Sequence, residues 1–122
     1  MTYLHLIDNL LQTIPEIEQS YINELDWWDG EPPGAHIVFG DILNPLLIEK
    51  LKMNDDIDLL KRIFDFFELM ALSDDEKVKE VLACTVLERL GDDKFILQQA
   101  EYFMKKSTMQ MSYNLEKGLG RL

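Results

Sequence analysis

Residues 57–72 read IDLLKRIFDFFELMAL, and their apolar positions recur with the period of an α-helix. The apolar side chains gather on one broad face of this predicted helix, which is formed by Leu59, Leu60, Ile63, Phe64, Phe66, Phe67 and Met70. A helix with so wide an apolar stripe needs neighbours on more than one side to cover it. We therefore predict that residues 57–72 form the central helix of the fold.

The segments on both sides of this helix show the same period, and convincing strand alternation is absent from the sequence. Further helices are predicted over residues 3–12, 15–28, 45–53, 74–90, 93–104 and 107–119. Polar caps, prolines and a glycine mark where several of them begin or end. These signals are an N-cap and first-turn proline at Asn44-Pro45, a capping box from Ser73 to Glu76, a stop at Gly91, and caps at Asp92-Asp93 and Ser107.

One segment is ambiguous, because residues 35–43 fit either a short strand or a helical turn. The rest predicts an all-α fold, a compact bundle of about six or seven short helices in a single domain spanning residues 1–122. Because the predicted linkers between residues 46 and 105 are short, neighbouring helices should pack antiparallel. The three helices from residue 57 to residue 104 are similar to stacked hairpins of the HEAT kind.

Composition narrows the class of protein further. Of the 122 residues, 47% are hydrophobic, which is enough to form a folded core. No apolar run approaches the roughly 18–20 residues that a membrane span requires, and the first residues lack the basic region of a signal peptide. Cys84 is the single cysteine, so we predict no intramolecular disulfide, a cytoplasmic location, and a buried structural thiol among apolar neighbours.

The charge of −11 is unevenly distributed along the chain. Residues 1–49 contain nine acidic residues and no lysine or arginine, whereas the remainder carries 14 acidic and 12 basic residues. So negative a segment repels nucleic-acid backbones and anionic membranes, and it favours a basic protein partner. The alternative is that the acidity serves solubility alone.

Motifs for catalysis are missing from the sequence. His5 and His36 are far apart, and there is neither a cysteine pair nor a nucleophile elbow nor a glycine-rich phosphate loop. Asp55-Asp56-x-Asp58 resembles part of a calcium loop, but it lacks the glycine and closing glutamate of that motif and is better explained as a helix start. We therefore expect no catalytic residues, no metal and no cofactor.

Folding alone does not explain residues 24–34, ELDWWDGEPPG. Adjacent residues on a helix point about 100° apart, so both tryptophans cannot lie on one narrow core stripe. An exposed indole ring among carboxylates has the composition of a recognition surface. The predicted partner-binding residues are Glu24, Asp26, Trp27, Trp28, Asp29 and Glu31. The competing interpretation is that both rings seal the end of the helical core beneath a rigid loop.

Two strings, HIVFGDILNP at residues 36–45 and LACTVLERLGD at residues 82–92, carry a family resemblance. With the residues between them, they resemble a small, acidic, all-helical bacterial family of poorly characterised proteins. Such families are similar to the immunity proteins of polymorphic-toxin and contact-dependent growth inhibition systems. The resemblance implies a role and no active site.

These observations lead to three hypotheses. In the first, the chain is an immunity-type protein that binds a cognate toxin domain, a basic nuclease, and neutralises it by occluding its active site. In the second, it is a HEAT-like adaptor or regulatory subunit that binds through a groove of its middle helices. In the third, it is a carboxylate-based metal hydrolase. The sequence does not determine the oligomeric state.

Overall fold

The computed structural model describes residues 1–29 and 31–122 of the chain. In this part all regular structure is helical, in seven helical stretches, which confirms the all-α prediction. The elements are η1 (Tyr3–His5), α1 (Leu6–Thr13), η2 (Pro15–Ile17), α2 (Glu18–Trp27), α3 (Ala35–Ile37), η3 (Val38–Leu43), α4 (Asn44–Met53), α5 (Ile57–Ala71), α6 (Glu76–Glu80), η4 (Val81–Leu87), α7 (Glu88–Leu90), α8 (Lys94–Glu101) and α9 (Lys106–Gly118).

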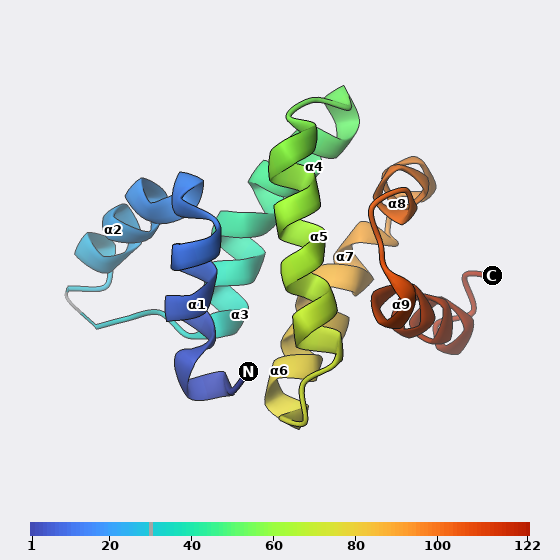
Figure 1. Cartoon of the computed structure of the whole chain (residues 1–122). Coiled ribbons are helices and arrows are strands. Elements are labelled where there is room, and N and C mark those ends of the chain that lie inside the picture. The colour runs from blue at the N-terminus through green and yellow to red at the C-terminus, as the bar shows by residue number, and fades with distance from the viewer. Residues whose placement is uncertain (30) are drawn as a thin grey trace.

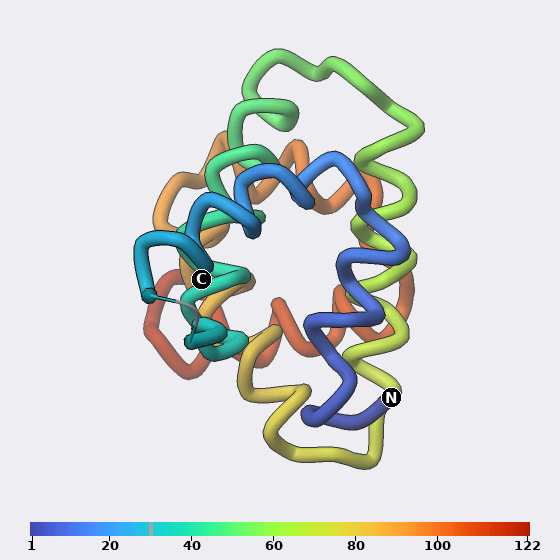
Figure 2. Tube along the Cα trace, turned by 90° about the vertical axis from the view of Figure 1, so that its left-hand side faces the viewer, coloured from blue at the N-terminus to red at the C-terminus, as the bar shows by residue number. Residues whose placement is uncertain are grey.

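Helix α5 is central, as its broad apolar stripe predicts. It contacts α1, α4, α6 and α9, and all seven residues of its predicted apolar face are buried. The α1–α2 pair lies at one end of the bundle and the α8–α9 pair at the other (Figure 1). Viewed from the α1–α2 end, α1 lies in front of α5 and runs alongside it (Figure 2). The two pairs are therefore separate surfaces joined through a common core.

The ambiguous segment 35–43 is helical and not a strand. Helices α3 and α4 form one continuous helix that passes through the π-helical segment η3. The predicted start of a helix at Asn44-Pro45 is therefore wrong, because the helix begins after Gly34. Pro45 has no N–H to donate to the Asp41 carbonyl and its ring clashes with that carbonyl in a regular α-turn. The wider π-turn accommodates this proline within the helix.

A second π-helical segment, η4, lies in the continuous helix formed with α6 and α7 and packs against η3. The wider turn leaves the Thr85 carbonyl free to accept a hydrogen bond from Asn44 Nδ2 at 3.0 Å. The two helices approach closely here, because a Cβ at Gly40 would lie 3.3 Å from Thr85 Cγ2. His36 Nδ1 also contacts the Thr85 hydroxyl, at 2.5 Å. Asn44 thus joins two helices and caps neither.

Several helix starts are capped by residues other than those predicted. Asp75, and not Ser73, caps α6, since its carboxylate accepts from the Lys77 N–H at 3.0 Å. Ser73 instead donates its hydroxyl to the Met1 carbonyl, at 2.6 Å. Asp93 caps α8 as predicted, accepting from the backbone N–H groups of Phe95 and Ile96.

The predicted cap of α9, Ser107, is also wrong, because a carboxylate from α5 performs this role. Glu68 accepts from the backbone N–H groups of Ser107 and Thr108 at 3.0 and 2.9 Å, and from the Thr108 hydroxyl at 2.9 Å. Burial opposes the charge on Glu68, but these hydrogen bonds outweigh it and hold the pKa of the carboxyl below its ordinary value. Glu68 therefore fixes α9 against the central helix.

Gly91 ends α7 where predicted, but for a different reason. Its φ is −75°, so the left-handed conformation of a glycine stop is not used. A Cβ at this position would instead lie 2.2 Å from Glu116 Oε1. Arg121 binds the same carboxylate through Nε at 2.6 Å, and it also donates to Asp92 at 2.9 Å and to the Glu88 carbonyl at 3.1 Å. A glycine is needed here to admit this network.

Cys84 is exposed, which corrects the prediction of a buried thiol. The neighbouring buried residues are Leu82 and Val86. Each is two positions away, which is about half a helical turn, so Cys84 lies off their stripe. Its apolar neighbours in sequence are therefore not its neighbours in space.

Candidate functional site

Both tryptophans lie outside the core, at the end of α2. Trp27 is 82% exposed and Trp28 is 40% exposed, so the interpretation in which both rings are core is wrong. Trp28 is held by its own helix, because its Nε1–H donates to Glu24 Oε2 at 3.0 Å. Trp27 is therefore an exposed indole beside a fixed one.

The structure brings the predicted partner-binding residues together at the last turn of α2 and the turn that follows. The Asp29 N–H donates to the Asp26 carbonyl at 3.3 Å, and the Glu31 N–H donates to the Trp28 carbonyl at 3.1 Å. Asp29 takes a left-handed conformation with φ of 56°. Gly30 lies outside the described residues. We call these six residues the tryptophan patch: Glu24, Asp26, Trp27, Trp28, Asp29 and Glu31.

Little neutralises the acidic residues of this end of the bundle. Among the described residues, Glu16 is the only acidic side chain of residues 1–49 with a lysine or arginine nitrogen within 4 Å of its carboxylate. Its partner is Arg62 of α5, which also donates to the Thr13 carbonyl at 3.1 Å. Hydrogen bonding to Arg62 lowers the pKa of Glu16, so this carboxyl stays charged in mildly acidic solution. The other eight acidic residues of this segment have no such basic partner in the described part of the chain.

Helix α2 packs only loosely on the bundle. None of its residues is buried, whereas the longer and more apolar α5 buries seven. Tyr21 and Leu25 are half-buried and Ile22 is 41% exposed. A shallow groove of about 520 Å³ runs between α1 and α2, lined by Leu11, Gln12, Pro15, Glu18, Tyr21, Ile22 and Leu25. We call it the α1–α2 groove.

This groove was not predicted from the sequence. A signal was present, because Tyr21, Ile22 and Leu25 recur at helical spacing after the proline turn η2 that separates α2 from α1. Trp27 is five positions from Ile22, which corresponds to about 140° around the helix. The α1–α2 groove and the exposed indole therefore lie on different faces of α2.

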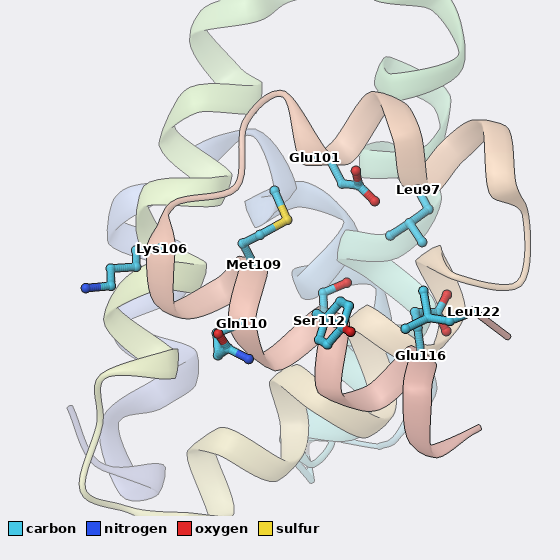
Figure 3. A pocket seen from close by; sticks show the side chains of 9 residues that line it. Leu97, Glu101, Lys106, Met109, Gln110, Ser112, Glu116 and Leu122 are labelled. Atoms are coloured by element: carbon cyan, nitrogen blue, oxygen red, sulfur yellow. The ribbon is translucent and has the colours of Figure 1, made fainter. Parts of the chain in front are cut away.

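A second hollow lies at the opposite end of the bundle, between α8 and α9 (Figure 3). It measures about 570 Å³ and was not predicted from the sequence. Leu97, Met109, Tyr113 and Leu122 supply its apolar lining, and Glu101 and Lys106 carry opposite charges at its rim. The carboxylate of Glu116, which also lines it, is neutralised by Arg121. This hollow therefore has little net charge.

The residues considered for catalysis do not form a site around a hollow. His36 contacts Thr85 at the crossing of the two π-helical segments, and neither residue lines the α1–α2 groove or the α8–α9 hollow. Asn44 Oδ1, buried at the same crossing, has no hydrogen-bond partner in the described part of the chain. Nor do residues 1–29 and 31–122 hold three histidine, cysteine or acidic side chains grouped for a metal ion. The crossing serves to join two helices.

Within the described residues, no helix combines the length and the apolar character needed to cross a bilayer.

Fold and site together define a small, acidic, all-helical protein with an exposed aromatic and carboxylate surface. The chain belongs to the DUF7674 family, described as a domain of unknown function, whose model matches residues 7–119. No curated protein and no solved structure matches the chain. The match covers both α2 and the tryptophan patch.

Proposed function

We propose that this protein is a bacterial immunity-type inhibitor that binds a cognate toxin domain, a basic nuclease, in the cytoplasm. The observation that carries the proposal is Trp27, which is 82% exposed at the end of a helix and lies in an acidic segment, residues 1–49, that contains no lysine or arginine. Exposing a large indole ring to water is unfavourable, and covering it with a partner removes this cost. Tryptophan is also enriched among residues that contribute most to binding.

Electrostatics supports a basic partner. A nuclease carries a cationic groove for the phosphate backbone, and the carboxylates of residues 1–49 are opposite to it in sign. Such complementarity accelerates association, which suits an inhibitor that must act before the toxin does. In this proposal the tryptophan patch enters or covers the groove and occludes the active site. The resemblance of residues 36–92 to immunity-type families supports the same role.

Co-expression with the toxin domain encoded beside this chain tests the proposal. We expect growth to be protected and a complex to form at low salt. Combined charge reversal by Glu24→Lys, Asp26→Lys and Asp29→Lys should abolish both effects. The matched control is Asp58→Lys, Asp74→Lys and Glu80→Lys, which changes the net charge equally at three exposed positions outside residues 1–49. Protection that survives the first set, or a neighbouring toxin that never binds, contradicts the proposal.

The alternative function is an adaptor or regulatory subunit, and the α8–α9 hollow favours it. Its apolar lining and the 52% exposed Tyr113 offer a contact surface independent of charge. An adaptor that binds there should tolerate reversal of Glu24, Asp26 and Asp29 but lose its partner on Tyr113→Ser. Capture experiments with these two variants separate the two functions.

A further inference from the structure

We propose that the α1–α2 groove receives an amphipathic helix of the partner protein that presents aliphatic side chains flanked by lysine or arginine. This inference rests on the proposed function, because it assigns a second contact to the same basic partner. The tryptophan patch and the groove are then two contacts on different faces of α2.

The floor of the groove is apolar and incompletely covered. Leu11 of α1 faces Tyr21, Ile22 and Leu25 of α2 across it. Ile22 is 41% exposed in the middle of α2, and no residue of that helix is buried. A helix laid in such a groove contributes aliphatic side chains at positions three and four apart, which match the spacing of these residues. No described residue of this chain therefore covers the apolar floor of the groove.

The rim of the groove determines the charge of that partner. Glu18 lines the groove directly, and Asp8 precedes Leu11 and Gln12 by one helical turn on the same side of α1. Neither carboxylate forms an ion pair within the described part of the chain, and residues 1–49 contain no lysine or arginine to supply one. An anionic or neutral apolar helix would leave these charges unmatched beside it. A cationic amphipathic helix pairs with them and covers Ile22 at the same time.

The other hollow does not share these properties. At the α8–α9 hollow, the lining residues Glu101 and Lys106 carry opposite charges, and Arg121 neutralises Glu116. The same cationic helix thus gains no electrostatic advantage there. This difference makes the α8–α9 end an internal control for the experiment.

The probe is a synthetic amphipathic peptide with leucines on one helical face and lysines on the other, titrated into the full chain. Two control peptides replace its leucines with serine or its lysines with glutamate. We expect the first peptide to shift backbone amide resonances of residues 8–12 and 18–26, and both controls to bind at least about tenfold more weakly. A serine-substituted peptide that binds equally well, or shifts centred on residues 97–113, would overturn the inference.

The variant Ile22→Ser tests the apolar floor without disturbing the core. We expect about a tenfold loss of peptide affinity, as for partial loss of one buried aliphatic side chain. Leu69→Ser is the matched control, because Leu69 is 56% exposed on α5, away from the groove, and its loss should leave the affinity unchanged. Equal affinities of the two variants would contradict the inference. So would concentration-dependent dimerisation of the unliganded chain that Ile22→Ser abolishes, since the groove would then hold a second copy.

The two proposals can fail separately. If charge reversal of the tryptophan patch abolishes protection against the toxin while Ile22→Ser alters neither protection nor peptide binding, only the groove inference fails. If the peptide binds in an Ile22-dependent manner and no neighbouring toxin is neutralised, only the proposed function fails.

Discussion

The two ends of the bundle each expose an aromatic side chain to a similar degree, but they differ in how their carboxylates are paired with basic side chains. Trp27 at the α1–α2 end is 82% exposed and Tyr102 at the α8–α9 end is 84% exposed. At the α8–α9 end Arg121 alone binds Glu116, Asp92 and a backbone carbonyl. At the α1–α2 end a single arginine, from α5, neutralises one carboxylate among the described residues. The comparison teaches that exposed aromatic area does not distinguish the two ends, whereas the supply of basic side chains for their carboxylates does.

The largest expected effect comes from the core that both ends share. Phe64 is fully buried in α5 and its ring packs against Phe67 at 5.2 Å and against Phe103 at 5.9 Å between centroids. Phe64→Ala should lower the free energy of unfolding by about 3–5 kcal/mol, because it removes a large side chain and leaves a cavity. Urea denaturation followed by circular dichroism measures this loss. Separate transitions for the two ends, in place of one, would contradict a shared core.

The next effect is confined to the α8–α9 end. Gly91→Ala places a Cβ against Glu116 and Arg121, and it should cost about 1–3 kcal/mol through overpacking of this network. Gly118→Ala is the matched control, because nothing lies within 4 Å of its Cβ and alanine is the better helix former. Thermal unfolding of both variants checks the prediction. A Gly91→Ala protein as stable as the control would contradict the prediction, because Glu116 and Arg121 would then move aside without loss of stability.

The pH dependence of stability should also arise at the α8–α9 end. The folded-state pKa of Glu68 lies below the ordinary value of 4.5, so its contribution is present above that pH and is lost as the pH falls through the folded pKa. Glu68→Gln should therefore cost about 1 kcal/mol at neutral pH, which is typical of a lost helix cap, and less in acid. Denaturation curves at several pH values measure this convergence. Parallel pH profiles for the two proteins would contradict the prediction.

The smallest effect belongs to the α1–α2 end. Glu16→Gln removes an exposed ion pair with Arg62 and should cost roughly 0.2–1 kcal/mol or less. Because α2 has no buried residue, the loss should appear chiefly as faster amide hydrogen exchange in residues 18–27. Unchanged exchange in α2, with stability lost uniformly, would indicate that α2 is held by contacts other than this pair.

Sequence periodicity predicted the central helix and the helical class, because both depend on apolar spacing within one segment. It could not assign residues 35–43 to helix or strand, because the π-helical segment η3, just before Pro45, interrupts the α-helical period. Of the helix caps, the local one at Asp93 was predicted, the local one at Asp75 was placed two residues too early, and the distant one at Glu68 was missed. A cap that comes from another helix leaves no mark in the sequence beside the helix it caps.

The same distinction applies to the candidate site. The tryptophan patch could be predicted because its six residues are almost contiguous, so no tertiary contact was needed to bring them together. The α1–α2 groove and the α8–α9 hollow each need two helices in a particular arrangement. Single-sequence periodicity assigns Ile22 to an apolar face but does not reveal whether anything covers that face. Its exposure depends on how α2 packs against the bundle, where its tertiary neighbour is η3.

The position of Trp27 and Trp28 has an optical consequence. They are the only tryptophans in the chain, and both lie in the tryptophan patch. Indole emission from this protein therefore arises from one surface alone, from a ring open to solvent and a ring fixed on Glu24. The protein carries its own reporter at the place where we expect a partner to arrive. Its fluorescence needs no added label to report the event.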